Sequence, residues 1–110
     1  MGKHIKNKNS FLFLFYPESR GAYSAFAVDF GQATSGNTKY KAERMAGDLL
    51  NILVDLEEYA YLKDDKNRKK HWEVDPDELY YEFTGDSLSE EDRKGVYYKY
   101  IYPRAYYIKE

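Results

Sequence analysis

The first strong hydrophobic pattern is the run SFLFLFY at residues 10–16, which is dense in aromatic and aliphatic side chains. The segment AYSAFAVD, residues 22–29, follows it and alternates between two sets of side chains, as a strand does. The five residues between them, 17–21, begin with proline and end with glycine, a composition typical of a hairpin loop. The pattern predicts an antiparallel hairpin.

A third, brief strand is predicted at residues 34–35, before Gly36 turns the chain. Asn37 or Thr38 then caps a helix, since either side chain can accept a hydrogen bond from an unpaired backbone N–H group. Helical i, i+3, i+4, i+7 spacing of apolar residues predicts that this helix runs from Lys39 to about Leu62. The predicted core positions are Ala42, Met45, Ala46, Leu49, Leu53, Leu56 and Ala60.

Charge dominates the next part of the chain. Residues 63–71, KDDKNRKKH, contain no apolar residue and predict a solvated loop. Residues 72–92 carry nine acidic side chains and no Lys or Arg, with LYYEF at 79–83 as the only apolar cluster. A solvated face is the simpler explanation of this acidic run, and a surface that binds a cationic partner is the competing one.

Two short elements are expected near the end of the chain. Ser87 or Ser89, ahead of Glu90, predicts a capped single turn of helix. GVYYKYIY, residues 95–102, is rich in β-forming residues and predicts a last strand, with Pro103 at an edge or bend.

These elements predict an α+β fold: an antiparallel sheet of β-β-β-α-β order with one long helix on one face. We expect one domain over residues 10–110, containing the charged loop 63–71, after a basic flexible tail at residues 1–9. The chain has 13 Tyr against 6 Phe and 1 Trp, which favours a tyrosine-rich sheet with one exposed face.

Composition narrows the class of partner. The formal net charge of −2 gives no reason to expect nucleic acid as the main partner. The absence of cysteine excludes disulfides, thiol nucleophiles and cysteine-based metal sites. The apolar run 11–15 is too short for a signal peptide or a membrane span, so we expect a soluble, cytoplasmic protein.

The first half of the chain resembles the HicB-like antitoxins, whose N-terminal domain has a partial ribonuclease H-like β-β-β-α-β arrangement. The resemblance covers roughly residues 11–62. The structural motif that carries it consists of Tyr16-Pro17, Gly21-Ala22-Tyr23, Val28-Asp29-Phe30-Gly31, Thr34-Ser35-Gly36-Asn37-Thr38 and the helix positions Ala42, Ala46 and Leu49-Leu50.

This resemblance implies an antitoxin that neutralises a small basic HicA-type ribonuclease by masking its RNA-binding surface. We expect a homo-oligomer, and no direct binding of operator DNA, because no second long periodic helix follows residue 62. The alternatives are an orphan HicB-like scaffold, or an inhibitor of another nucleic-acid enzyme, and, third, a ribonuclease H-like nuclease. The partner-binding residues predicted from the acidic run are Asp75, Asp77, Glu78, Tyr80 and Glu82.

The sequence does not predict enzyme chemistry. Gly31 and Gly36 do not form a phosphate-binding motif, because no Gly-Lys-Ser/Thr or Gly-x-Gly-x-x-Gly is present. Asp29 and Asp48 are the only acidic pair in the predicted core, where a two-metal nuclease needs a convergent set of carboxylates. His4 and His71 lie in charged, surface-type segments. We therefore predict no catalytic residue, metal or cofactor.

Overall fold

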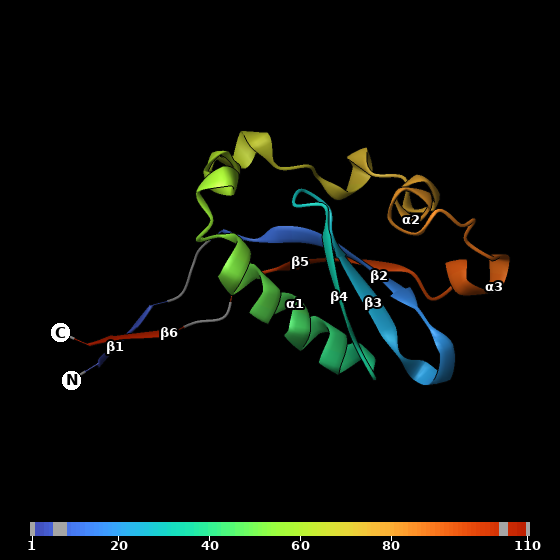
Figure 1. The fold of residues 1–110 in the computed structure, drawn as a ribbon, viewed down its shortest axis with the longest axis horizontal. Helices are drawn as coiled ribbons and strands as arrows, with labels where there is room; N and C mark the ends of the chain where they lie inside the picture. The colour runs from blue at the N-terminus through green and yellow to red at the C-terminus, as the bar shows by residue number, and fades with distance from the viewer. Residues whose placement is uncertain (1, 6–8, 104–105, 110) are drawn as a thin grey trace.

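The computed structural model describes the backbone of residues 2–5, 9–103 and 106–109 and the side chains of residues 9–103. It confirms the predicted α+β class. The main sheet contains β2 (Phe11–Pro17), β3 (Tyr23–Ala27), β4 (Gln32–Gly36) and β5 (Tyr97–Ile101), and the helices are α1 (Lys39–Leu53), α2 (Pro76–Thr84) and α3 (Glu90–Arg93). The strand order is β4-β3-β2-β5, antiparallel throughout. In Figure 1 the sheet lies between α1 and the segment that carries α2 and α3.

The predicted hairpin is formed by β2 and β3, which pair from Phe13 opposite Ala27 to Pro17 opposite Tyr23. The loop contains one 3₁₀ turn, η1 (Ser19–Gly21), with a positive φ of 80° at the glycine. Glycine has no Cβ and adopts this conformation at low cost, as the hairpin prediction required. The predicted third strand is β4, which is longer than residues 34–35.

β2 has a core on each of its two faces. Its first six residues are all 2% exposed or less, and alternate residues join different clusters. Phe11, Phe13 and Phe15 face α1, whereas Leu12 and Leu14 belong to the cluster that includes Leu79 of α2. The prediction of a sheet with one exposed face is therefore wrong. A continuous apolar run without polar alternation fits a strand that is buried on both sides.

α1 begins where predicted and ends earlier. Thr38 is the N-cap, and its side-chain oxygen accepts a hydrogen bond from the backbone N–H of Lys41 at 3.0 Å. The helix ends at Leu53, and the 3₁₀ segment η2 (Glu57–Lys63) follows, so the predicted extension to Leu62 is wrong.

The length of the sheet explains this early end. A helix from residue 39 to 62 would be about 36 Å long, whereas the seven residues of β2 span about 24 Å. Breaking the helix turns the chain back, so that Leu62 is only 2% exposed and Tyr59 packs edge-on against Phe30 at 4.9 Å. The bend therefore buries side chains that a straight helix would carry past the sheet.

The buried face of α1 is also rotated from the prediction. Met45 and Leu56 are 38% and 39% exposed, Ala60 is exposed, and Leu49 is half-buried. The helix packs through a set of mostly small residues, because small side chains allow a close approach to the sheet. This buried set is Ala42, Ala46, Gly47, Leu50 and Leu53.

The second half of the chain contains one helix that the sequence analysis did not predict, α2, which includes the LYYEF cluster. The capped turn was predicted correctly: it is α3, and Ser89 accepts a hydrogen bond from the N–H of Asp92 at 3.1 Å. The charged segment 63–71 is mostly exposed and contains a short 3₁₀ turn, η3 (Asp65–Asn67); a second one, η4 (His71–Glu73), begins at its last residue. The predicted last strand is β5.

The stretch predicted as an N-terminal tail contains a strand, β1 (Gly2–Ile5), which pairs antiparallel with β6 (Tyr106–Lys109) as a separate two-stranded sheet. The side chain of His4 lies outside the described part of the chain. Among the described residues, the longest apolar helix falls short of what a membrane crossing needs.

Candidate partner-binding surface

α2 carries standard helix-boundary residues at both ends. Asp75 is the N-cap, and its carboxylate accepts the N–H of Asp77 at 2.9 Å. Pro76 occupies the first turn, where its missing N–H costs nothing, and Gly85 closes the helix with a left-handed φ of 77°. The boundaries of this short helix are therefore set by its own sequence.

One side of α2 is apolar and lies against the sheet. Leu79 is 7% exposed, and the Phe83 ring stacks on Phe26 of β3 with a centroid distance of 4.3 Å. Tyr80 packs against Tyr16 at 5.1 Å. Burial raises the pKa of Tyr80 above its ordinary value, which keeps this phenol neutral. The packing turns the opposite side of the helix toward solvent.

The solvent side of α2 is acidic with one aromatic side chain. A shallow pocket of about 510 Å³ is lined by Asp77, Glu78, Tyr81 and Glu82. The ring of Tyr81 is 60% exposed. We call these four residues the acidic face of α2.

A second, smaller pocket lies beside this face. It has a volume of about 150 Å³ and separates α2 from the turn that contains Val28 and Gly31. Glu78 and Glu82 contribute to both pockets, and neither carboxylate has a hydrogen-bond or ion-pair partner within residues 9–103. Two carboxylates without an ion-pair partner therefore lie one helical turn apart, and Lys69 is among the other residues that line the smaller pocket.

Asp77 differs from these two glutamates. Both of its oxygens accept hydrogen bonds from Arg93, at 3.2 and 3.0 Å. This pairing raises the pKa of Arg93 further above its ordinary range. The acidic run itself contains no Lys or Arg, but the residue directly after it supplies a counter-charge, which an analysis confined to the run does not reveal.

The predicted partner-binding residues therefore lie together at α2 but divide into two groups. Asp75 caps the helix, Asp77 binds Arg93, and Tyr80 packs inward, so these three have partners within the chain. Glu78 and Glu82 are the exposed, unpaired members. Tyr81 was missed, although the i, i+4 spacing from Asp77 would have placed it beside the acidic residues once a helix was recognised.

The predicted structural motif has clear local roles. Gly31 has a positive φ of 65° in the turn after β3. Gly36 lies where a Cβ atom would come within 2.3 Å of the backbone nitrogen of Ala42, so only glycine lets β4 pass this close to α1. Tyr23 is buried and donates a hydrogen bond to the carbonyl of Gly95 at 3.3 Å. Thr34 lies in β4 opposite Ala25, and Asn37 precedes the capping residue of α1.

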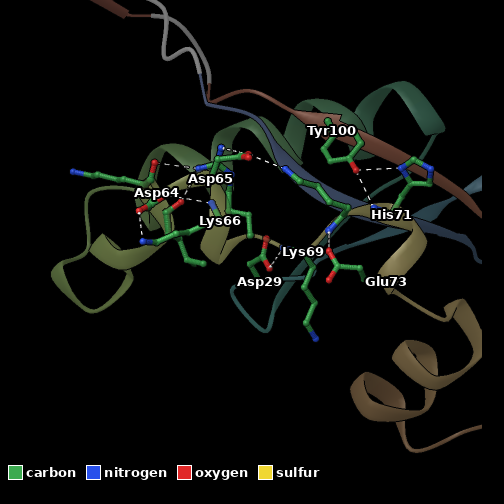
Figure 2. Close-up of polar contacts among 12 residues, drawn as sticks. Asp29, Asp64, Asp65, Lys66, Lys69, His71, Glu73 and Tyr100 are labelled. Atoms are coloured by element: carbon green, nitrogen blue, oxygen red, sulfur yellow. Dashed lines mark hydrogen bonds and ion pairs between the residues drawn. The ribbon is translucent and has the colours of Figure 1, made fainter.

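Asp29 joins this motif to the charged segment, as Figure 2 shows. Its Oδ1 atom accepts a hydrogen bond from the backbone N–H of Lys69 at 3.0 Å, and its Oδ2 atom is buried without a partner in the described part of the chain. Burial raises the pKa of Asp29 above its ordinary value, against the opposing effect of the Lys69 N–H. Within residues 9–103 no three His, Asp or Glu side chains are grouped so as to hold a metal ion.

His71 lies at the other end of the same segment. Its backbone N–H donates to the phenol oxygen of Tyr100 at 2.9 Å, and its Nδ1 lies 3.2 Å from the same oxygen (Figure 2). The imidazole also contacts Trp72 edge-on at a centroid distance of 5.0 Å. His71 is thus a surface residue, as predicted, in an aromatic setting formed by Trp72 and by Tyr98 and Tyr100 of β5.

Searches against protein-family models, curated proteins and solved structures found no match to this chain.

Proposed function

We propose that this chain is a non-enzymatic cytoplasmic binding protein, similar to a HicB-like antitoxin, that neutralises a small basic HicA-type ribonuclease. The observation that supports it best is the pair of exposed, unpaired carboxylates of Glu78 and Glu82 beside the exposed ring of Tyr81. Carboxylates attract a cationic surface, and an aromatic ring adds apolar contact at the centre of an interface.

Masking is the proposed mechanism. A ribonuclease must present cationic side chains to the phosphate backbone of its substrate. The acidic face of α2 offers the same type of charge on a rigid helix, which is fixed to the sheet by Leu79 and Phe83. Bound there, the chain occludes the RNA site of the partner, and no covalent chemistry takes place.

The first experiment asks whether such a partner exists. The tagged chain is purified from its native cells at low salt, and a co-purifying small basic protein is separated from it under denaturing conditions and refolded. We expect that protein, by itself, to cleave RNA. The cleavage should stop when the chain is added back. Co-purification without RNA cleavage would contradict the proposed activity of the partner.

The second experiment tests the surface with matched variants. Glu78→Gln/Glu82→Gln removes the two unpaired charges, and Glu57→Gln/Glu58→Gln removes two exposed charges on η2 as a control. We expect the first variant to associate more slowly and with a flatter salt dependence, because rim charges act mainly on the association rate. Equal rates and salt slopes for the two variants would show that the acidic face only solubilises the protein.

The alternative function, a dimeric scaffold or an inhibitor of another nucleic-acid enzyme, uses the same fold. The observation that favours a scaffold is the outer edge of β5, which has no strand partner among the described residues. A wild-type chain that self-associates but binds no ribonuclease would favour it.

A further inference from the structure

β5 forms one end of the main sheet. Its inner edge pairs with β2 from Tyr97 opposite Phe15 to Ile101 opposite Phe11, and its outer edge faces no strand in the described part of the chain. A sheet strand bonds each neighbour through alternate residues, so the outward N–H and C=O groups of β5 remain available for a further strand.

The sequence of β5 does little to discourage such pairing. Edge strands are usually guarded by proline, bulges or unpaired charges. β5 has no proline, and its only charged residue is Lys99, whose ammonium lies 2.5 Å from a carboxylate oxygen of Glu43 on α1. Although burial raises the pKa of Glu43, hydrogen bonds from Lys99 and Tyr97 outweigh it and hold the pKa below its ordinary value. The lysine is therefore neutralised within its own chain.

The opposite end of the sheet is different. β4 consists of small and polar residues, QATSG, and α1 begins soon after it, at Lys39. Gly36 at its end lies too close to Ala42 for any side chain. Tyrosine and isoleucine make up the rest of β5, and these residues favour strand pairing more than the residues of β4 do. β5 is therefore the edge suited to association.

We propose that β5 pairs antiparallel with β5 of a second copy, so that two four-stranded sheets join into one across a two-fold axis at Lys99. In this register Tyr98 of each copy lies opposite Tyr100 of the other. Tyr98 and Tyr100 are 38% and 37% exposed in the single chain. Cross-strand aromatic pairs stabilise a sheet, and the two-fold axis forms this pair twice.

Charge complementarity favours a second copy over an unrelated strand. Two lysines placed opposite each other repel. Each Lys99 already has Glu43 beside it, so the axis brings together two cations and two carboxylates with no net charge. β5 supplies the aromatic pairs and the lysine, and α1 supplies the carboxylate that balances the lysine. A pairing of five residues is a small interface, so the dimer should dissociate on dilution.

Sedimentation velocity over a range of concentrations tests the proposal without any other protein, so the result does not depend on the proposed ribonuclease partner. We expect the wild type to shift from monomer to dimer as concentration rises. Tyr98→Lys/Tyr100→Lys places four added positive charges at the axis and should stay monomeric. Tyr40→Lys/Tyr61→Lys makes the same charge change at tyrosines that are 74% and 56% exposed, away from both β5 and the acidic face of α2, and should dimerise like the wild type.

A wild type that is monomeric at every concentration overturns the proposal. So does a dimer that persists in the β5 variant or is abolished equally in the control. Circular dichroism first checks that the variants fold. If the β5 variant is unfolded, hydrogen exchange of the wild type decides: amides of β5 should be better protected at high concentration than at low, and unchanged protection overturns the proposal.

Discussion

At the scale of single residues, Arg68 fixes a segment that its sequence marks as a solvated loop. Its side chain is 8% exposed, and it donates hydrogen bonds to the carbonyl oxygens of Leu62 and Lys63 at 2.8 and 3.2 Å. The guanidinium also lies 5.1 Å from the ring centroid of Phe11 in β2. An arginine can combine an apolar contact with several hydrogen bonds, which a lysine cannot do in the same geometry.

Asp29 leads to a prediction about pH. Its pKa is raised in the folded protein, so the ionised carboxylate lowers stability at neutral pH, and that destabilisation disappears as pH falls through the folded pKa. Asp29→Asn keeps an acceptor for the N–H of Lys69 and removes the buried charge. We expect a higher melting temperature than wild type at pH 7, with a difference that shrinks toward roughly pH 4.

Thermal melts at several pH values measure this difference, and Asp55→Asn, at an exposed aspartate, is the matched control with little expected change. An Asp29→Asn variant that melts lower than wild type at pH 7 would mean that the charged hydrogen bond to Lys69 outweighs the cost of burial.

Local residue roles could be predicted where they depend on neighbours in the chain. Thr38 and Ser89 were each one of two capping residues predicted from the few residues around them, and the glycine of the hairpin was predicted in the same way. The bonds from Lys69 to Asp29 and from Arg93 to Asp77 join residues 40 and 16 positions apart. Such pairs form only when the fold brings two segments together, and pattern analysis has no access to that distance.

At the scale of elements, the ends of α2 are marked in the sequence itself. Asp75, Pro76 and Gly85 stand at the N-cap, the first turn and the C-terminal end of the helix, which is a complete boundary signature. The early end of α1 could not be predicted in this way, because the helical spacing of apolar residues continues past Leu53. There the dimensions of the sheet override a periodic pattern, and these dimensions follow from the whole fold.

The observed core of α1 contains Leu50, whereas the predicted core contained Leu49. Leu50 is fully buried and Leu49 half-buried. We expect Leu50→Ala to lower the free energy of unfolding by about 2–5 kcal/mol, and Leu49→Ala to lower it less, because the cost grows with the buried apolar volume removed and with the cavity that remains. Urea unfolding of both variants measures the order. A larger effect of Leu49→Ala would place the helix face predicted from the sequence against the sheet.

At the scale of the whole molecule, charge is distributed unevenly although the net charge is only −2. Residues 63–71 contain five Lys or Arg and two Asp, whereas residues 72–92 contain nine acidic residues. The two regions adjoin at the pocket between Lys69 and α2. Binding of a charged partner should therefore depend on its orientation, and the acidic face should meet a cationic surface first.

A prediction about catalysis also belongs to this scale. We expect the purified chain to leave RNA and RNA–DNA hybrids intact in the presence of Mg²⁺ or Mn²⁺, because a two-metal site requires several converging carboxylates. Gel analysis of labelled substrates measures cleavage. Metal-dependent cleavage that disappears in Asp29→Asn, while this variant still melts cooperatively, would replace the binding function with a nuclease.

The position of β2 in the sheet affects how the chain folds during its synthesis. Phe11 of β2 pairs with Ile101 of β5, almost the whole chain later. During synthesis the FLFLF segment leaves the ribosome long before β5 does, and the edge of β2 that pairs with β5 stays open until β5 follows. Exposed strand edges of this composition promote aggregation, and distant pairing slows folding. We expect a chain that ends at residue 95 to aggregate, as light scattering would detect, and a β5 peptide supplied in trans to reduce that aggregation.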